Sequence, residues 1–141
     1  MNMKIVEVKV SNFQQFRDCL KFAGQKDEDW IQFQNNPFRY CYLLQEQGVV
    51  CGYIDFSILY ERAELNHIYI KEEYRRKKYA SKLMEWMIEQ CERMHCSNIT
   101  LEVRESNLAA QKLYQHYQFV AVARRDKYYQ TEDAILMERT M

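Results

Sequence analysis

Residues 65–80 of this 141-residue chain read LNHIYIKEEYRRKKYA. The stretch begins as a strand-like run and ends at the start of a strongly amphipathic helical pattern, with four consecutive cations, residues 75–78, between them. At the start of a helix, unpaired backbone N–H groups and the helix dipole favour negative charge. A bare cationic run is usually a solvated loop. Placed between a strand and a helix, this one indicates a site for a phosphate-bearing ligand.

The overall composition makes any electrostatic recognition local. The chain carries 20 basic and 20 acidic residues, for a formal net charge of zero, and 48% of its residues are hydrophobic. This length and apolar content predict one domain, residues 1–141, with a real core. A neutral chain has no global field that would draw it onto nucleic acid or an anionic membrane. We therefore expect neither as a partner.

Cysteine and histidine usage indicates a reducing compartment and no metal site. The five cysteines are odd in number and form no C-x-x-C pair, which fits reduced thiols better than a disulfide framework. Together with only three histidines they show no metal-ligand spacing. No apolar signal core follows Met1, and no apolar run approaches the length of a membrane span. We expect a cytoplasmic protein, either a monomer or a homodimer.

Upstream of the basic turn, strand signals dominate. Alternation and β-branched residues predict strands over residues 4–10, 40–45, 49–59 and 63–70. Glu46-Gln47-Gly48 reads as a hairpin turn. Ser11 is the expected N-cap of a helix that contains Phe16. A second short helix is expected to begin at Asp27 or Asp29 and to run through Trp30 and Phe33.

Downstream, a long helix is predicted over residues 75–94. Its apolar stripe is typical of core packing and consists of Ala80, Leu83, Met84, Met87, Ile88, Cys91 and Met94. A half-buried strand over residues 99–103 follows, then a helix capped by Asn107, and closing strands over residues 119–123 and 134–137. The strand–helix–strand order around the long helix implies a parallel crossover, and the terminal hairpins imply antiparallel pairing.

Two side chains in the second half could move protons. Glu102 lies in an otherwise apolar strand, and Tyr114 falls one helix later, on the turn facing back toward the sheet. A carboxylate could take a proton from an attacking amine, and a phenol could give one to a leaving thiolate. Taken singly, a strand glutamate is usually solvated and a helix tyrosine is usually part of the core.

From Ala63 to Met137 the sequence resembles the GNAT-type N-acetyltransferases, most closely the RimI-like ribosomal-protein alanine N-acetyltransferases. The resemblance rests on five segments in order, A-E-L-x-x-I-x-I, R-R-x-x-Y-A, L-E-V-R-x-S-N, L-Y and E-D-A-I-L-M. It implies a GNAT-like α/β fold of mixed α+β type, with a mixed central sheet of about seven strands and helices on both faces. A splayed parallel strand pair would bind acetyl-CoA. The part before Ala63 matches in element order.

The resemblance also implies roles for individual residues. Glu102 matches the family's general base and Tyr114 its general acid. Asn107 matches an asparagine that contacts the cofactor. The strand that lines the acetyl and pantetheine part of acetyl-CoA corresponds to Ile68, Tyr69 and Ile70, and one of its backbone N–H groups is expected to polarise the thioester carbonyl. The turn that cradles the pyrophosphate corresponds to Arg75, Arg76, Lys77, Lys78, Tyr79, Ala80 and Ser81.

The chain departs from the family at three places. The turn pattern is R/Q-x-x-G-x-G/A, and its first glycine is Lys78 here. Lys78 could adopt an ordinary helical conformation and add a cation to the site, or it could obstruct the phosphate. A family glycine just before Phe119 is Gln118. The connection ahead of Glu132 looks shorter, and its Tyr128 and Tyr129 are candidate acceptor contacts or, equally, packed loop aromatics.

Several functions remain open at this level. The first is acetyl transfer from acetyl-CoA to the N-terminal α-amine of a protein, and the second is the same chemistry on a small amine such as a polyamine, amino acid or antibiotic. Lys78 in place of glycine motivates a third, a non-catalytic CoA-binding domain. Nucleic-acid binding has a small basic footprint and no stacking platform. A ping-pong route through Cys51 or Cys96 is disfavoured because unpaired cysteines are mostly inert.

Overall fold

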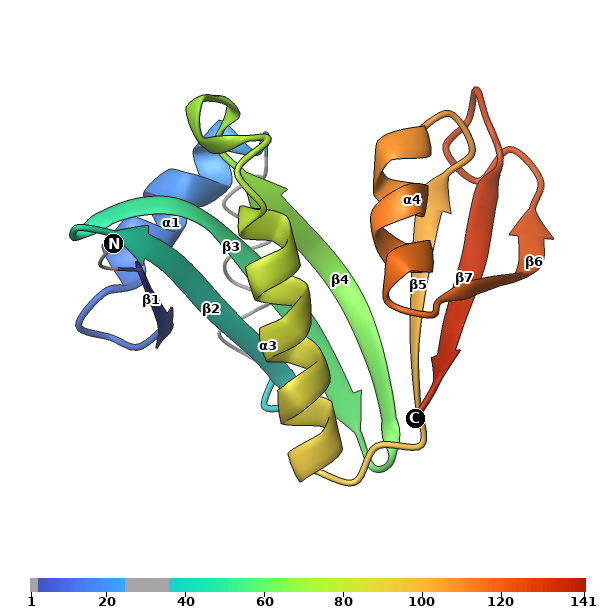
Figure 1. The fold of residues 1–141 in the computed structure, drawn as a ribbon, viewed down its shortest axis with the longest axis horizontal. Helices are drawn as coiled ribbons and strands as arrows, with labels where there is room; N and C mark the ends of the chain where they lie inside the picture. Colours follow the sequence, from blue (N-terminus) through green and yellow to red (C-terminus); the bar gives the residue numbers. More distant parts are fainter. Residues whose placement is uncertain (1–2, 25–35) are drawn as a thin grey trace. The chain divides into compact units, whose positions relative to one another are not determined.

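A computed structural model describes residues 3–24 and 36–141 of the chain. The short helix expected over residues 27–33 lies outside this part. The elements follow in the order β1 (Met3–Glu7), α1 (Phe13–Phe22), β2 (Arg39–Glu46), β3 (Val49–Leu59), β4 (Arg62–Ile70), a 3₁₀ turn (Glu72–Tyr74), α3 (Tyr79–Arg93), β5 (Asn98–Arg104), α4 (Leu108–His116), β6 (Val120–Arg125) and β7 (Ala134–Thr140) (Figure 1). Among these helices, none is long and apolar enough to cross a bilayer.

The strands form a mixed sheet, as expected. Hydrogen bonds connect seven strands in the order β1-β2-β3-β4-β5-β7-β6. The pairs β1–β2, β2–β3, β5–β7 and β6–β7 are antiparallel, and β4 and β5 are parallel across the α3 crossover. The parallel ladder covers three residue pairs, from Arg62–Asn98 to Glu64–Thr100, although β4 has nine residues and β5 has seven. The parallel pairing of β4 with β5 confirms the predicted crossover.

The chain divides into two compact units. The first unit comprises Met1–Ser57 and Asn66–Met87, and the second comprises Ile58–Leu65 and Ile88–Met141. The basic turn and the second half of β4 belong to the first unit. Glu102, Asn107 and Tyr114 belong to the second. Each unit is described by itself below.

In the first unit, helices pack on both faces of the sheet (Figure 1). Side chains alternate across a strand, so neighbours in β2 face opposite ways. On one face, Phe16 and Leu20 of α1 pack with Leu43 of β2 in a buried cluster. On the other face, the Tyr42 ring lies 5.4 Å from the Trp86 ring of α3. The two-sided burial explains why β2 and β3 read as nearly continuous apolar runs.

The predicted hairpin turn between β2 and β3 is confirmed. Glu46 pairs with Val49, so Gln47 and Gly48 form a two-residue loop. Both have positive φ, 51° and 81°. A tight hairpin of type I′ requires positive φ at both central residues, which glycine adopts without strain.

In the second unit, the strand predicted around residue 101 alternates as expected. Ile99, Leu101 and Val103 of β5 are buried, and Glu102 between them is half-buried. The α4 helix places Tyr114 over this core, with its ring 6.0 Å from the Phe119 ring. The sequence pattern therefore predicted correctly which face of β5 is the core.

Several predicted boundaries differ from the structure. The first strand ends at Glu7, not at residue 10, and the last strand continues to Thr140, beyond the predicted end at residue 137. The N-cap of α1 is Asn12, not Ser11, and its side chain accepts from the Lys9 backbone N–H at 2.7 Å rather than from the helix. The long helix begins at Tyr79, not at residue 75, because left-handed backbone in the basic turn cannot belong to a right-handed helix. The apolar stripe ends at Cys91, since Met94 is 44% exposed beyond the end of α3.

Candidate active site

The basic turn leaves backbone donors open to solvent. Arg76, Lys77 and Lys78 are exposed, and within the described ranges their backbone N–H groups donate to no other backbone group. A hydrogen bond entering α3 runs from the Lys82 N–H to the Lys78 carbonyl at 3.3 Å. N–H groups ahead of that bond lie at the positive end of the helix dipole. This arrangement can bind an anion.

Lys78 has a left-handed backbone conformation. Its φ is 64°, and Arg76 two residues earlier also has a φ of 64°. The alternative of an ordinary helical conformation at Lys78 is therefore wrong. Gln118, the other position where the family has glycine, has a φ of 65°. At both positions the chain keeps the backbone shape that glycine adopts freely, with a side chain for which that shape is strained.

This strain makes a stability prediction. Lys78→Gly is expected to raise the free energy of unfolding by about 0.5–1 kcal/mol. Glycine removes the left-handed penalty of about 1–2 kcal/mol, and part of this gain is offset because glycine increases the conformational entropy of the unfolded chain. Lys77→Gly is the matched control: it removes the same charge at a position without positive φ. We expect the control to lose stability. Urea unfolding of both variants measures the difference, and a destabilised Lys78→Gly variant would contradict the strain argument.

The strand segment before the turn is fixed from both sides. The Tyr69 side chain turns toward α1, where its hydroxyl donates to the Phe22 carbonyl at 3.1 Å. Arg75 folds back onto β4: its Nε donates to the Ile70 carbonyl at 2.8 Å, and its guanidinium lies 5.6 Å from the Tyr69 ring centroid. Arg75 therefore contacts the end of β4 as well as belonging to the basic turn. Because the Tyr69 side chain is engaged with α1, its backbone groups are the ones that could contact a ligand.

A glycine in β3 lets this segment lie close. A Cβ on Gly52 would stand 2.2 Å from the Tyr69 carbonyl oxygen and 3.0 Å from the Ile70 Cα. Both neighbours are backbone atoms, which cannot move aside as a flexible side chain can. Gly52 thus allows β4 its close approach at the residues expected to line the thioester. Nothing in the sequence singled out this glycine.

Tyr79 connects the start of α3 to the β2–β3 hairpin. Its ring is buried, and its hydroxyl donates to the Glu46 carboxylate. That hydrogen bond is the main cause that raises the pKa of Tyr79 to about 12. The contact holds the first helical residue against the hairpin end.

Glu102 in the second unit is held at one oxygen. Its Oε1 forms an ion pair with Arg125 Nε of β6 at 3.1 Å. Its Oε2 is buried and has no hydrogen-bond partner among the described residues. A buried acceptor without a donor is costly, so this oxygen is suited to a donor that a ligand supplies.

Tyr114 is a phenol that stays protonated. Burial, and to a smaller extent the neighbouring Tyr129, raise its pKa to about 12. The pKa of Tyr129 is raised by burial and then by the charges of Glu102 and other neighbours. Tyr129 is therefore within electrostatic reach of both Glu102 and Tyr114. A neutral phenol of this kind can donate a proton but not accept one.

Asn107 caps α4 as predicted. Its Oδ1 accepts from the Ala110 backbone N–H at 3.1 Å. The cap occupies Oδ1 of the exposed Asn107 side chain. The other amide atom, Nδ2, is therefore the group that could donate to a ligand.

The loop between β6 and β7 is fixed by charge. Arg124 bridges Glu105 and Asp133, whose Oδ2 lies 2.8 Å from Arg124 Nη1. Arg124 is also the main cause that lowers the pKa of Asp133. The two loop tyrosines both lie against arginines: Arg104 is 4.2 Å from the Tyr129 ring centroid and Arg125 is 5.1 Å from that of Tyr128. Tyr128 and Tyr129 are thus held in place, with Tyr128 51% exposed.

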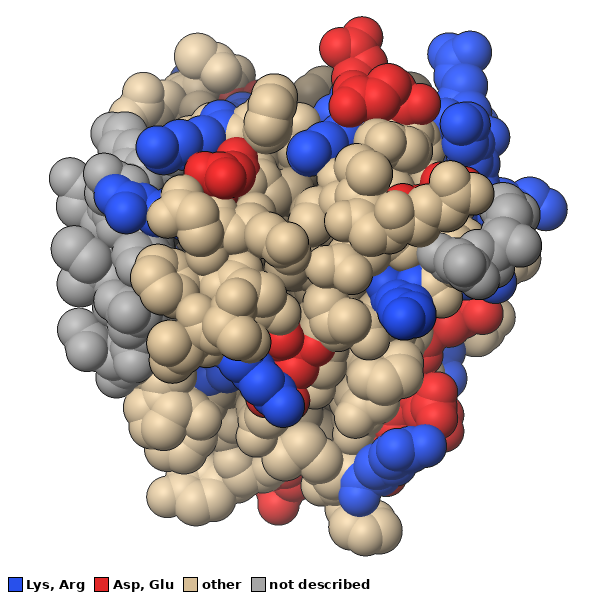
Figure 2. Space-filling view, turned by 90° about the vertical axis from the view of Figure 1, so that its left-hand side faces the viewer, with Lys and Arg blue, Asp and Glu red and all other residues tan. Residues whose placement is uncertain are grey.

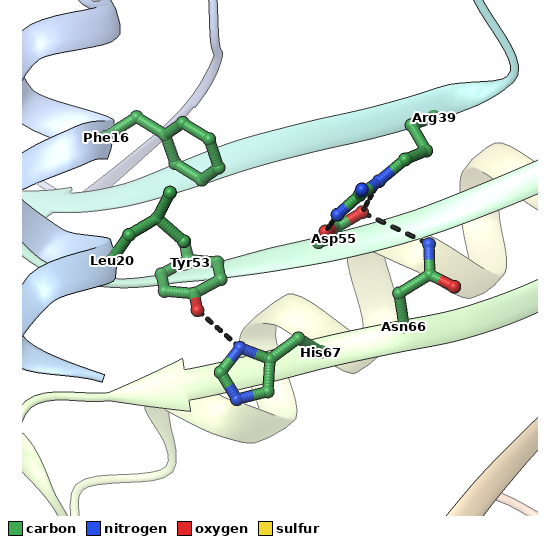
Figure 3. Close-up of a pocket in the computed structure, with 7 residues that line it drawn as sticks. All are labelled: Phe16, Leu20, Arg39, Tyr53, Asp55, Asn66 and His67. Carbon is green, nitrogen blue, oxygen red and sulfur yellow. Dashed lines mark hydrogen bonds and ion pairs between the residues drawn. The ribbon is translucent and has the colours of Figure 1, made fainter. Parts of the chain in front are cut away.

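A polar pocket lies in the first unit beside His67 (Figure 3). Its volume is about 140 Å³. It is lined by Phe16, Leu20, Arg39, Tyr53, Asp55, Asn66 and His67. The Tyr53 hydroxyl and His67 Nδ1 share a hydrogen bond, and Asp55 accepts from Arg39 Nε at 3.1 Å and from Asn66 Nδ2 at 3.2 Å. His67 directly precedes the Ile68–Ile70 segment, and no pattern in the sequence pointed to this group.

The cysteines are poor nucleophiles. All five are buried, and burial is the largest cause that raises the pKa of each one. The pKa of Cys19 rises to about 11 and that of Cys91 to about 12. The thiolate, which is the reactive form, is therefore scarce at neutral pH. Covalent transfer through Cys51 or Cys96 gains no support.

The surface charge is mixed. On the face in Figure 2, lysine and arginine side chains are interspersed with aspartate and glutamate. This agrees with the zero net charge and makes the basic turn a local feature.

A sequence comparison places the chain in a family. The pattern of the Acetyltransferase (GNAT) family matches residues 9–119. The chain therefore belongs to the GNAT family of acetyltransferases and is an acetyl-CoA-dependent N-acetyltransferase.

Among its relatives, the [ribosomal protein bS18]-alanine N-acetyltransferase of Escherichia coli (strain K12) is 30% identical over 120 residues, which is 82% of this chain and 75% of that protein. The crystal structure of the ribosomal-protein-S18-alanine N-acetyltransferase from Escherichia coli matches with a TM-score of 0.88 and 23% identity, over 99% of this chain and 94% of that one. The structure of a GNAT family acetyltransferase from Elizabethkingia anophelis with acetyl-CoA bound matches with a TM-score of 0.83 and 16% identity, over 99% of each chain. These two structures support the fold.

Proposed function

We propose that this protein transfers the acetyl group of acetyl-CoA to the N-terminal α-amine of a protein, with a ribosomal protein as acceptor. The observation that carries the proposal is that the second unit contains both a carboxylate, Glu102, whose buried Oε2 has no donor among the described residues, and a phenol, Tyr114, whose pKa is raised to about 12. The relative from Escherichia coli acts, by its name, on the alanine of ribosomal protein bS18. We also propose that residues 1–141 make one domain, most of which the family pattern covers.

In this proposal the residues of the first unit bind acetyl-CoA. The open backbone donors of Arg76, Lys77 and Lys78 would hold the pyrophosphate together with the first turn of α3. The cationic side chains add charge. The backbone of Ile68, Tyr69 and Ile70 would lie along the acetyl and pantetheine part, and an N–H there would polarise the thioester carbonyl.

The residues of the second unit would carry the proton transfers. An α-amine has an ordinary pKa of about 7.7–8.0, so about a tenth to a third is neutral near pH 7. Glu102 Oε2 would take the proton that the amine loses as it attacks the thioester carbon. Tyr114 would then give its hydroxyl proton to the departing CoA thiolate. Tyr128 and Tyr129 would contact the acceptor chain from the β6–β7 loop.

A small amine is the second candidate acceptor. The pocket beside His67 favours it, because about 140 Å³ is close to the roughly 150 Å³ that accommodates a benzene-sized group. Its polar wall would suit a small polar molecule better than a purely apolar one.

The two candidates are separated by one experiment. The protein is incubated with acetyl-CoA and a panel of peptides, including ribosomal-protein N-terminal sequences, and in parallel with polyamines, amino acids and aminoglycosides. Mass spectrometry of the products measures transfer. We expect kcat/KM to be highest for a peptide. A preference for free amines would replace the first proposal with the second, and binding of acetyl-CoA without transfer to any acceptor would leave a CoA-binding domain.

A further inference from the structure

The two carboxylate oxygens of Glu102 have different surroundings, because only one of them is in the ion pair with Arg125. Arg125 is the last residue of β6, and its Nε lies 3.1 Å from Oε1. Oε2 is buried and lacks a hydrogen-bond partner in the described part of the chain. The carboxylate therefore has one oxygen bound to a cation and one without a donor among the described residues.

Arg125 is itself held in orientation. Its guanidinium lies 5.1 Å from the centroid of the Tyr128 ring, and Tyr128 in turn packs edge-on against Tyr129 with ring centroids 5.1 Å apart. The planar guanidinium can lie against an aromatic ring while it binds a carboxylate, which a lysine cannot do equally well. Tyr128, Arg125 and Glu102 thus form a continuous chain of contacts.

The neighbouring arginines are engaged elsewhere. Arg104 lies over the Tyr129 ring and 3.5 Å from Glu132, and Arg124 bridges Glu105 and Asp133. Among the residues with described positions, Glu102 is the carboxylate that pairs with Arg125. Arg125 is also 57% exposed at its side chain, so it contributes little to the core.

We propose that Arg125 is a positioning residue that holds Glu102 by Oε1, so that Oε2 receives the proton of the acceptor amine. This inference rests on the proposed role of Glu102 as the base. In the step, the lone pair of the amine nitrogen forms the bond to the thioester carbon, and the C–S bond breaks with its electron pair leaving on the CoA sulfur, which takes the Tyr114 proton. An N–H bond of the acceptor breaks, its proton forms an O–H bond at Oε2, and its electron pair stays on nitrogen. Arg125 keeps its charge throughout. Its charge then favours return of the proton from Oε2 to water, which restores the carboxylate.

A double-mutant cycle tests this coupling. We expect Arg125→Gln to lower kcat by about 10- to 100-fold, as for a catalytic group that has lost its orientation, and to leave the Kd of acetyl-CoA unchanged. Arg125→Lys should recover part of kcat, because it keeps the charge but not the planar contact with Tyr128. In the Glu102→Gln background, Arg125→Gln should cause no further loss, since its partner carboxylate is gone.

Arg93→Gln is the control. It removes the same charge from an exposed helical pair with Glu89, and it should leave kcat unchanged. Wild-type melting temperatures for the Arg125 variants would show that they fold normally. If Arg125→Gln lowered kcat equally with and without Glu102, Arg125 would act independently of the base, and the inference would be wrong while the base assignment stood. An unchanged kcat in Glu102→Gln alone would overturn both.

Discussion

Replacing Glu102 by glutamine is expected to lower kcat by about 10²- to 10⁴-fold, the usual contribution of a general base. Glutamine keeps the shape of the side chain but cannot accept the proton that the amine loses. The Kd of acetyl-CoA should be unchanged, because Glu102 is not among the residues expected to bind it. Steady-state kinetics with a peptide acceptor and calorimetry with acetyl-CoA measure the two quantities.

Tyr114→Phe is the partner experiment. The variant keeps the buried ring beside Phe119 and loses only the hydroxyl, so we expect the same pattern of low kcat and unchanged acetyl-CoA binding. With the pKa of Tyr114 raised to about 12, its protonated form persists through neutral pH and is lost only as the pH rises toward that value. Glu89→Gln and Tyr60→Phe, both at exposed positions, serve as controls. Unchanged kcat in both site variants would remove their proposed roles.

The parts of the fold that depend on local pattern could be predicted from the sequence. Alternation in β5, the amphipathic stripe of α3, the Asn107 cap and the Gln47-Gly48 turn each follow from the chemistry of a few neighbouring residues. The start of α3 could not be predicted in this way. A cation at position 78 reads as a helix residue, and only the backbone conformation shows that it stands in a glycine-like position.

Side-chain contacts between strands far apart in the sequence could not be predicted from local pattern. The pair of Glu102 and Arg125 depends on how β6 pairs with β7, and that register shifts by one residue between Ala121 and Ala123. A one-residue shift reverses which face of the sheet each later side chain occupies. Arg124 and Arg125 therefore each lie on the face opposite to the one that regular alternation from Val120 would give them. Alternation counted along the sequence cannot reveal such a bulge. The same reasoning applies to Asp55, whose partners lie on β2 and β4.

Asp55→Ala is expected to lower the free energy of unfolding by about 3–5 kcal/mol, the cost of breaking a buried ion pair by removing one partner. Asp55 is 3% exposed, and it accepts from Arg39 Nε at 3.1 Å and from Asn66 Nδ2 at 3.2 Å. Its loss would remove the carboxylate that pairs with the Arg39 guanidinium, whose side chain is 18% exposed. The expected loss is a large part of the about 5–15 kcal/mol that stabilises a typical domain.

The chain offers a matched control and a rescue for this prediction. Glu89→Ala breaks an ion pair of 2.8 Å whose side chains are 50% and 67% exposed, and it should cost less than about 1 kcal/mol. Replacing both partners together, as Arg39→Met with Asp55→Leu, should recover most of the stability lost by Asp55→Ala, since both charges of this pair are removed. Urea unfolding measures all of these variants. Equal losses from Asp55→Ala and Glu89→Ala would show that burial of the Asp55 pair is not what makes it important, and the pocket beside His67 would then need another source of rigidity.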